Sequence, residues 1–336
     1  MINIKKIPTF LLLIAFAISC RKEDAQQFDG PDLNDLYGPF SIIKDITFSK
    51  KDIDFAADGN LVVNGELSKN TDWTITFTGS QSGAVRTIQG FDRILSSENA
   101  SWEGGANSFP AFNLEKVYVE ISFPKEENAP IIKDSVNIVG AKIDKGIFVT
   151  GFEDGLGTNW TRFNQSTVTG NITCGDGQAA KENCYYGWNG TVGWDWAIGS
   201  VNVRPDNGNF GLPASATNLF FNMAVNFIEN TGPDNCFILF WFDEDENGDG
   251  TFNSSTEDRY IYEYWYKKDG WDLISLNYND LQFDAEGNKI EVFGNGLPEP
   301  SKLHAINVFF LANPANGNAK AFADHIIFTT DEPYRP

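Results

Sequence analysis

The chain has 336 residues with 25 Lys+Arg and 46 Asp+Glu, so its formal net charge is −21. A hydrophobic fraction of 41% and an aromatic fraction of 14% are enough for large cores, and they exclude a mainly disordered chain. The negative charge repels phosphate backbones and argues against nucleic acid as a partner, and two histidines, His304 and His325, are too few for His-based nucleophilic or multi-His metal chemistry.

The first segment of the chain is predicted to be an export signal with a lipid anchor. In residues 1–19, Lys5 and Lys6 precede an apolar run that is too short to span a bilayer, and small residues lead up to Cys20. This pattern resembles a bacterial lipobox, which implies that the signal peptide is removed and that Cys20 is acylated. An ordinary secretory signal is the alternative.

Residues 20–37 follow the predicted anchor. They are charged and rich in Asp, Gln and Gly, which is typical of a flexible tether. Their start, Cys-Arg-Lys-Glu-Asp, resembles the acidic export signal of surface-exposed lipoproteins of Bacteroidetes. The resemblance implies a protein that is held at the outer membrane and faces the cell exterior.

Residues 38–143 are expected to form a small β-sandwich. Helix signals are nearly absent, and segments rich in Thr, Val, Ile and aromatic residues alternate with Asp-Gly, Asn-Gly and Gly-Gly turns. Trp73-Thr-Ile-Thr-Phe, the turn at 82–84, Trp102-Glu-Gly-Gly and Phe109 follow in an order that resembles the immunoglobulin-like modules of bacterial surface proteins. The resemblance implies a spacer domain in which the two Trp residues pack in the core or at its edge.

Residues 144–336 are expected to form a second all-β domain. Phe152-Glu-Asp-Gly followed by Trp160, Trp271-Asp-Leu-Ile-Ser-Leu, and Asp324-His-Ile-Ile-Phe together resemble carbohydrate-binding modules of the galactose-binding jelly-roll type. The chain is thus predicted to be all-β, with an N-terminal immunoglobulin-like sandwich followed by a galactose-binding-type β-jelly-roll. In several families of such modules a Glu near the first strand and an Asp near the last bind one structural calcium ion. The matching positions are Glu153 and Asp324, and two solvated strand-end acids are the alternative.

Three further cysteines lie in the second domain. Cys174 and Cys184 flank a polar loop, which outside the cytosol is more typical of a disulfide than of a metal pair. Cys236 lies in a strand-like apolar run and is expected to be a buried free thiol.

An acidic loop follows the strand-like run that ends at Phe242. Five of the seven residues 243–249 are acidic, and oxygen-bearing side chains stand at alternate positions with glycine at the sixth. Calcium needs about six or seven oxygen ligands, which this spacing helps to supply, and carboxylates so close together repel one another without a cation. The pattern matches the first half of an EF-hand loop, although the twelfth position is Ser254 and the flanking segments are strand-like. A solvated acidic turn is the alternative. We predict a structural calcium site with the ligands Asp243, Asp245, Asn247, Asp249, Thr251 and Asp258, in which Glu257 or Asp258 closes the loop.

The segment 185–196 places five aromatic residues among glycines and is the main ligand-binding candidate. Core strands rarely need glycine beside every large ring, whereas an exposed platform does. Sugar rings stack their C–H faces on Trp and Tyr while amides and carboxylates bind their hydroxyls, so a neutral glycan suits this segment and an acidic protein. At least one of the last two Trp residues is expected to fill the core instead. The predicted ligand-binding residues are Tyr186, Trp188, Trp194 and Trp196, together with Trp160.

Two strand-like segments raise the question of which face meets a ligand. Within 218–228, alternate residues from Leu219 to Phe227 form an apolar face that must point into a core. Asn222 lies on the opposite face and is a further ligand candidate if that face lines a groove. In 259–266, three tyrosines alternate with Glu263 and Trp265, and either face can meet solvent.

These features favour a lipid-anchored, non-catalytic protein that captures a polysaccharide or oligosaccharide for an outer-membrane uptake system. The lipobox, tether, spacer and terminal module together resemble the surface glycan-binding lipoproteins that accompany polysaccharide-utilisation systems in Bacteroidetes. The resemblance implies three partners: a glycan, the outer membrane and a glycan transporter complex. The predicted cofactor is structural calcium.

Two other functions suit the same scaffold. A glycoside hydrolase needs two carboxylates about 5–9.5 Å apart, for which Glu263 is the best acid candidate and Asp195 a conceivable partner. A lyase needs a base near Arg residues, and the second domain is poor in Arg. We therefore predict a non-catalytic protein and assign no catalytic residue. An adhesin or structural lipoprotein without a sugar site is the other alternative, because fold alone does not fix function.

Overall fold

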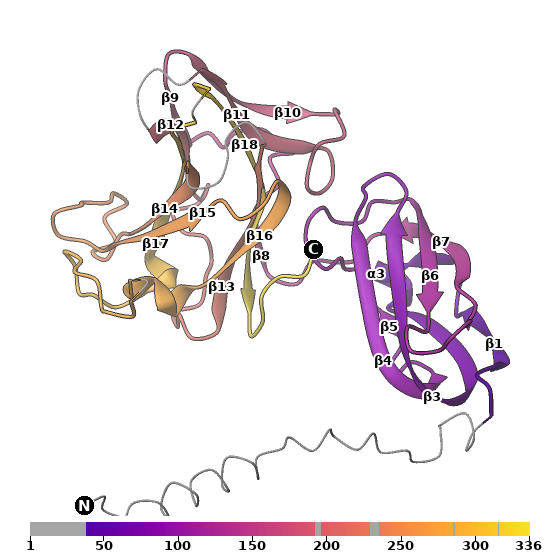
Figure 1. Cartoon of the computed structure of the whole chain (residues 1–336). Helices are drawn as coiled ribbons and strands as arrows, with labels where there is room; N and C mark the ends of the chain where they lie inside the picture. The colour runs from indigo at the N-terminus through magenta and orange to yellow at the C-terminus, as the bar shows by residue number, and fades with distance from the viewer. Residues whose placement is uncertain (1–37, 192–195, 229–234, 285, 315) are drawn as a thin grey trace, which may run out of the picture.

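The computed structural model describes residues 38–191, 196–228, 235–284, 286–314 and 316–336 (Figure 1). The predicted signal peptide, the lipidation site Cys20 and the tether lie outside the described residues, as do Trp194 and Asp195. Within the described part of the chain, no helix has both the length and the apolar character needed to cross a membrane.

The prediction of an all-β chain is confirmed. The first part forms a seven-stranded sheet with the order β1-β3-β6-β7-β2, in which β4 and β5 also pair with β3. Its elements are β1 (Ile42–Phe48), β2 (Asp52–Asp54), the single helical turn α3 (Phe55–Asp58), β3 (Leu61–Gly79), β4 (Val85–Leu95), β5 (Ser101–Trp102), β6 (Lys116–Ser122) and β7 (Ile132–Gly140).

The long strand β3 organises the core of the first part. Its residues alternate between buried and half-exposed along most of the strand, as a sheet with one buried face requires. Trp73 is 1% exposed, and the fully buried Trp102 stacks on Phe77 with ring centroids 4.3 Å apart. The expectation that both Trp residues pack in the core or at its edge is therefore confirmed, and both lie in the core.

The second part is a sandwich of two sheets (Figure 1). One sheet has six strands in the order β10-β11-β18-β13-β16 with β8 paired to β18, and the other has five in the order β15-β14-β17-β12-β9. Their strands are β8 (Ile147–Thr150), β9 (Thr161–Asn164), β10 (Val168–Cys174), β11 (Cys184–Thr191), β12 (Trp196–Val203), β13 (Leu219–Phe227), β14 (Cys236–Glu244), β15 (Arg259–Trp265), β16 (Gly270–Asn277), β17 (Leu303–Ala312) and β18 (Asn318–Thr330). Two 3-10 turns, η2 (Tyr278–Gln282) and η3 (Pro300–Lys302), connect β16 to β17.

Apolar side chains from both sheets fill the space between them. On β13, the alternate residues from Leu219 to Phe227 are at most 2% exposed, and they share one cluster with Phe240 and Phe242 of the facing sheet. The apolar face predicted for 218–228 therefore points into the core. Cys236, which forms no disulfide, is fully buried there as well, and burial raises the pKa of its thiol to about 12.

The outer face of the six-stranded sheet is covered around β13, β16 and β18 by the first part of the chain and by the C-terminal residues. Figure 1 shows the C-terminus between the two parts, where Ala106 N donates to Pro336 O at 2.6 Å. One buried cluster contains residues of both parts: Phe109, Ala111, Ala180, Ala224, Ile327 and Tyr334. We call this outer face the covered face.

A buried polar group reinforces the covered face. Asp144 accepts a hydrogen bond from the Tyr334 hydroxyl at 2.7 Å and pairs with the Lys181 ammonium. His325 lies 3.4 Å from the same carboxylate and is 3% exposed, and burial lowers its pKa to about 3. Burial thus favours the neutral form of the histidine, whose ring lies 5.8 Å from that of Phe109, 5.4 Å from that of Phe148 and 5.0 Å from that of Tyr334.

Candidate functional site

The outer face of the five-stranded sheet, which we call the open face, is the candidate site. Strand register places alternate residues of all five strands side by side on it. Their neighbours along the strands, such as Ile238, Phe240 and Val308, are fully buried in the core, so the alternate residues point away from the core. Two rows cross the five strands: Glu263, Leu239, Phe309, Ser200 and Phe163 form one, and Ile261, Trp241, Asn307, Asn202 and Thr161 form the other.

Large apolar side chains are exposed at both edges of the open face. On β15, Ile261 is 49% and Trp265 is 42% exposed, and on β9 Phe163 is 47% exposed. Because neighbouring strands lie about 4.8 Å apart, five strands span about 19 Å, which is the length of a short oligosaccharide. Exposed apolar side chains therefore flank a strip of polar and half-buried residues on this face.

Three aromatic rings cluster at one end of the open face. Trp265 stacks on Phe237 with centroids 4.4 Å apart and an angle of 26° between the rings. Trp196 lies 5.8 Å from Phe237 and 6.2 Å from Trp265. The structure therefore places Trp196, one of the predicted ligand residues, in this cluster.

Trp241 lies on β14, the second of the five strands of the open face. Its ring lies 4.4 Å from that of Phe309 on the neighbouring strand β17, with an angle of 54° between them. The guanidinium carbon of Arg259 lies 4.2 Å from the Trp241 ring centroid, in cation–π geometry. The indole is half-buried, so part of its surface stays available to a ligand.

A continuous chain of polar side chains runs beside Trp241 across four strands. Arg259 binds Asp243 through two parallel hydrogen bonds of 2.6 and 3.0 Å. Asn307 donates to the same carboxylate at 2.9 Å and accepts from Asn202, which in turn accepts from Arg204 at 2.7 Å. Such a network fixes the direction in which each amide and guanidinium faces, as a hydroxyl-binding site requires.

The carboxylate of Asp243 is engaged on the open face, and its role as a calcium ligand stays a prediction. Both of its oxygens are already engaged by Arg259 and Asn307 on the open face, and its side chain is 6% exposed. The physical reason is strand register: position 243 is still part of β14, directly opposite Arg259 of β15.

The exposed platform predicted for segment 185–196 is wrong for Tyr186 and Trp188. Both side chains are fully buried and belong to the core between the two sheets. The glycines make room for these rings: a Cβ on Gly170 would lie 2.8 Å from the Tyr186 hydroxyl, and one on Gly199 would lie 2.7 Å from Trp188 Cδ1. Glycine next to a large ring here indicates close packing rather than exposure.

Asn222 is also not a groove residue. It is 0% exposed on the covered face, and its amide nitrogen donates to Thr329 Oγ1 at 3.0 Å. Its amide oxygen accepts from Ser275 Oγ at 2.7 Å and from Tyr334 N at 3.1 Å. Thr329, Ser275 and the C-terminal segment therefore already bind the amide group with which Asn222 would contact a sugar.

Trp160 lies near the Arg204 end of the polar chain. It is half-buried against the core, and its Nε1 donates to Arg204 O at 2.8 Å. Its indole nitrogen is thus occupied by the backbone, and its role as a ligand residue stays a prediction.

The two faces of β15 are now distinguished. Tyr260 and Tyr264 point into the core at 0% and 6% exposure, whereas Glu263 and Trp265 lie on the open face. Trp265 Nε1 donates to Glu263 Oε2 at 3.1 Å. Asp243, a second carboxylate of this face, is bound by Arg259, so this pair offers no free base for hydrolysis.

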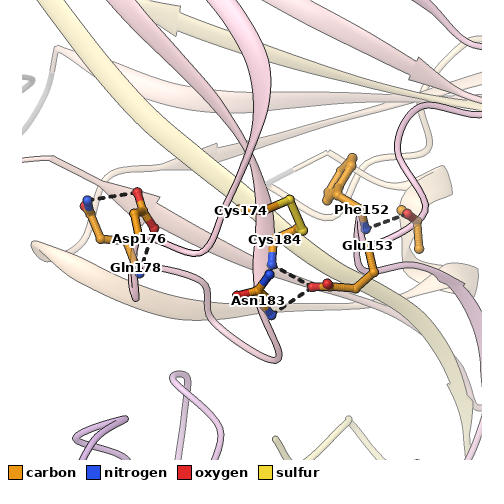
Figure 2. Close-up of a disulfide and its surroundings, with 8 residues drawn as sticks. Phe152, Glu153, Cys174, Asp176, Gln178, Asn183 and Cys184 are labelled. Carbon is orange, nitrogen blue, oxygen red and sulfur yellow. Dashed lines mark hydrogen bonds between the residues drawn. A yellow bond between two sulfur atoms is a disulfide. The ribbon is translucent and has the colours of Figure 1, made fainter.

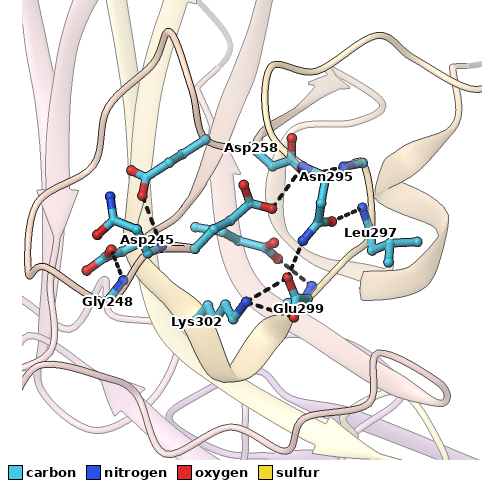
Figure 3. A network of polar contacts seen from close by, with 12 residues as sticks. Asp245, Gly248, Asp258, Asn295, Leu297, Glu299 and Lys302 are labelled. Atoms are coloured by element: carbon cyan, nitrogen blue, oxygen red, sulfur yellow. Dashed lines mark hydrogen bonds and ion pairs between the residues drawn. The ribbon is translucent and has the colours of Figure 1, made fainter.

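Backbone N–H groups of the acidic loop donate to carboxylates of the same loop. The first carboxylate that accepts them is Asp245, two residues after the predicted first ligand Asp243. Asp245 Oδ1 accepts from Gly248 N at 2.7 Å, and its Oδ2 accepts from Gly250 N at 2.7 Å (Figure 3). Asp249 Oδ1 accepts from both the backbone nitrogen and the hydroxyl of Thr251. The loop is thus organised around Asp245.

Glu257, not Asp258, folds back onto this loop. Its two oxygens accept from Asn247 N at 3.3 Å and from Asn253 N at 2.7 Å. The carboxylate of Asp258 points inward instead and accepts from Gly294 N and Gly296 N, both at 2.7 Å (Figure 3). Asp258 thus holds the segment 293–299, and its role as a calcium ligand stays a prediction.

Glu244 is a buried carboxyl beside this network. It is 0% exposed, and its Oε1 accepts from the Tyr278 hydroxyl and from Glu299 N, both at 2.9 Å. Burial raises the pKa of Glu244 to about 8, and the nearby charges of Asp258 and Glu299 add to the rise. Across the described residues, no three His, Cys, Asp or Glu side chains are arranged to hold a metal ion. Calcium in the acidic loop therefore stays a prediction.

Glu153, one member of the second predicted calcium pair, lies beside a disulfide (Figure 2). The structure joins Cys174 and Cys184 across β10 and β11. Glu153 Oε1 accepts from Cys184 N at 2.6 Å, and Asp324 Oδ2 accepts from Ala180 N at 3.0 Å. Burial raises the pKa of Asp324 well above its usual range. Both carboxylates thus hold the segment 180–184, and a calcium role for them stays a prediction.

No family model matches the chain, and no curated protein matches its sequence. Solved structures with similar arrangements of β-sheets exist at low sequence identity. Surface glycan-binding protein PbSGBP-B from Prevotella bryantii is 12% identical over 87% of this chain and 77% of that chain, with a TM-score of 0.38. SGBP-B from a complex xyloglucan utilization locus in Bacteroides uniformis is 10% identical over 87% and 73%, with a TM-score of 0.36. The family 11 carbohydrate-binding module from Clostridium thermocellum, in complex with a β-1,3-1,4-mixed-linked tetrasaccharide, is 13% identical over 56% and 98%, with a TM-score of 0.36.

Proposed function

We propose that the chain is a non-catalytic glycan-binding protein whose ligand lies across the open face. The observation that carries the proposal is the pair of rows in which apolar rings stand beside amides and a hydroxyl on five adjacent strands. Trp241, Phe309 and Trp265 offer ring surfaces for the C–H faces of sugars. Beyond the network bonds that fix their direction, the amides of Asn307 and Asn202 each keep one N–H donor and one oxygen lone pair for hydroxyl groups.

The charges on this face favour an uncharged glycan. Asp243 neutralises Arg259 through two hydrogen bonds, and the outward carboxylate of Glu263 contacts an indole N–H rather than a cation. The chain as a whole carries a formal charge of −21, which repels uronate or sulfate groups over long distances. A neutral polysaccharide or oligosaccharide is therefore the proposed ligand class.

The cellular setting is proposed from the N-terminal sequence. A lipidated Cys20 followed by a tether would hold the protein at the outer membrane, and the first β-domain would act as a spacer. In this position the open face would capture glycan for an outer-membrane transporter complex. Calcium is proposed to stabilise the structure without taking part in chemistry.

Affinity gel electrophoresis of the chain from residue 21 onward, against neutral and acidic polysaccharides, tests this function. We expect retardation by a neutral polysaccharide, loss of retardation in W241A, and no release of reducing ends. Absence of retardation by every polysaccharide, from a protein whose thermal melt shows a cooperative fold, contradicts the proposal.

A further inference from the structure

We propose that Phe252 of the acidic loop, acting through Arg259, is a positioning residue for the glycan platform on the open face. The guanidinium carbon of Arg259 lies 4.7 Å from the Phe252 ring centroid and 4.2 Å from the Trp241 ring centroid. The acidic loop would thus be part of the binding site although none of its residues needs to touch the sugar. This inference rests on the proposed glycan function.

The charge of Arg259 is already used within the protein. Its Nε and Nη2 donate to Asp243, and its side chain is only 27% exposed. Arg259 therefore contributes a planar guanidinium, fixed in position, that packs against the Trp241 ring. Lysine has the same charge but neither the planar shape nor the two-pronged hydrogen bond, so it cannot replace arginine in this role.

Trp241 depends on such contacts for its orientation. Its Nε1 is buried and has no hydrogen-bond partner among the described residues. The ring is held instead by packing, with Phe309 at 4.4 Å and Arg259 at 4.2 Å. Removal of one of these contacts frees the indole to rotate, and a mobile platform loses side-chain entropy when a sugar binds.

Phe252 is held in place by the closed acidic loop. The next residue, Asn253, donates its backbone N–H to Glu257 Oε2 at 2.7 Å, and Glu257 is 2% exposed. The preceding residue, Thr251, donates to Asp249 Oδ1 through its backbone at 2.9 Å. Closure of the loop by these carboxylates therefore sets the position of the Phe252 ring against Arg259.

The test is a comparison of F252A, R259K and the matched control F293A, each in the chain from residue 21 onward. Phe293 is 74% exposed on a neighbouring loop, so F293A removes an equally large ring that does not contact Arg259. Isothermal titration with the neutral polysaccharide that binds wild type measures affinity, and a thermal melt measures folding. We expect F252A and R259K to weaken binding by about threefold to thirtyfold, the range of a cation–π contact, while F293A binds like wild type.

A rescue variant separates positioning from a general structural role. F252W keeps an aromatic surface over Arg259 and is expected to restore affinity, whereas F252L keeps only apolar volume and is expected to bind as weakly as F252A. Wild-type affinity in F252A and R259K, together with lost binding in W241A, overturns the inference and leaves the glycan function standing. Equal rescue by F252L and F252W also overturns it. Absence of binding by wild type to every polysaccharide overturns the glycan function itself.

Discussion

The two outer faces of the sandwich carry similar residues, but other segments of the chain cover one face while the other meets solvent. On the covered face, Asn222 and Trp271 lie on adjacent strands, and the amide of Asn222 is completely satisfied by β16, β18 and the C-terminal segment. On the open face, Asn307 and Trp241 also lie on adjacent strands, but the edges of that face meet solvent. The difference teaches that an amide next to an aromatic ring on a strand indicates a sugar site only when no other part of the chain covers the strand.

The largest expected effect lies on the covered face. N222A removes an amide that makes several buried hydrogen bonds, and it leaves Ser275 and Tyr334 N without a partner. We expect the free energy of unfolding to fall by about 3 kcal/mol. Chemical denaturation measures this loss, and glycan affinity at a temperature where the variant is folded is expected to stay at the wild-type value. A stable N222A that no longer binds glycan contradicts the distinction between the two faces.

The two predicted calcium sites, in the acidic loop and at Glu153 and Asp324, can be tested separately. A calcium ion that binds only the folded state at a hundredfold excess over its Kd stabilises it by about 2.7 kcal/mol. We expect calcium to raise Tm relative to chelator, and D245N to abolish most of the rise because Asp245 organises the acidic loop. E153Q tests the pair beside the disulfide in the same way. Identical melts with calcium and with chelator would contradict both predicted sites.

The variant D243N tests the ion pair between Asp243 and Arg259 on the open face. Its expected effect on stability is smaller than that of N222A. The substitution keeps the shape of the side chain but removes the charge that pairs with Arg259. We expect a loss of about 1–2 kcal/mol in unfolding free energy, measured by denaturation, and weaker binding of a neutral glycan in titration. Stronger binding of an acidic polysaccharide than of a neutral one by wild type would show that the charge assignment of this face is wrong.

The last prediction concerns the pH dependence of stability at the covered face. Burial lowers the pKa of Lys142, which donates to Arg335 O, from 10.5 to about 8. Between these values the unfolded chain holds a proton that the folded chain has lost, so stability rises as pH increases through this window. We expect this rise, measured by denaturation at several pH values, to be reduced in K142M. Equal slopes in the two proteins contradict a buried, neutral Lys142.

The fold was predictable because strand periodicity is local. The alternation from Leu219 to Phe227 assigned one face of β13 to the core, and the structure agrees. Trp73 and Trp102 were likewise identified as packing residues. The sequence did not reveal that the C-terminal segment folds over Asn222, because that contact joins residues more than a hundred positions apart.

The candidate site was less predictable because five distant segments build it. Residues of β9, β12, β14, β15 and β17 form its rows, and no local motif joins them. One signal was present: β14 carries Phe237, Leu239 and Trp241 on one face and Ile238 and Phe240 on the other, so both faces are apolar. In a two-layer sandwich only one face of a strand meets the core, so the second apolar face indicates an additional contact. The glycines near Tyr186 and Trp188 resemble those of an exposed platform in sequence, whereas in the structure they make room for buried rings.

The most direct test of the central claim is isothermal titration of W265A and W271A with the polysaccharide that binds wild type. Both variants lose one Trp ring, but Trp265 is 42% exposed on the open face, and Trp271 donates to Gln178 O at 2.9 Å on the covered face. We predict at least about a tenfold loss of affinity in W265A and wild-type affinity in W271A. Lost binding in W271A with full binding in W265A would contradict the assignment of the glycan site to the open face.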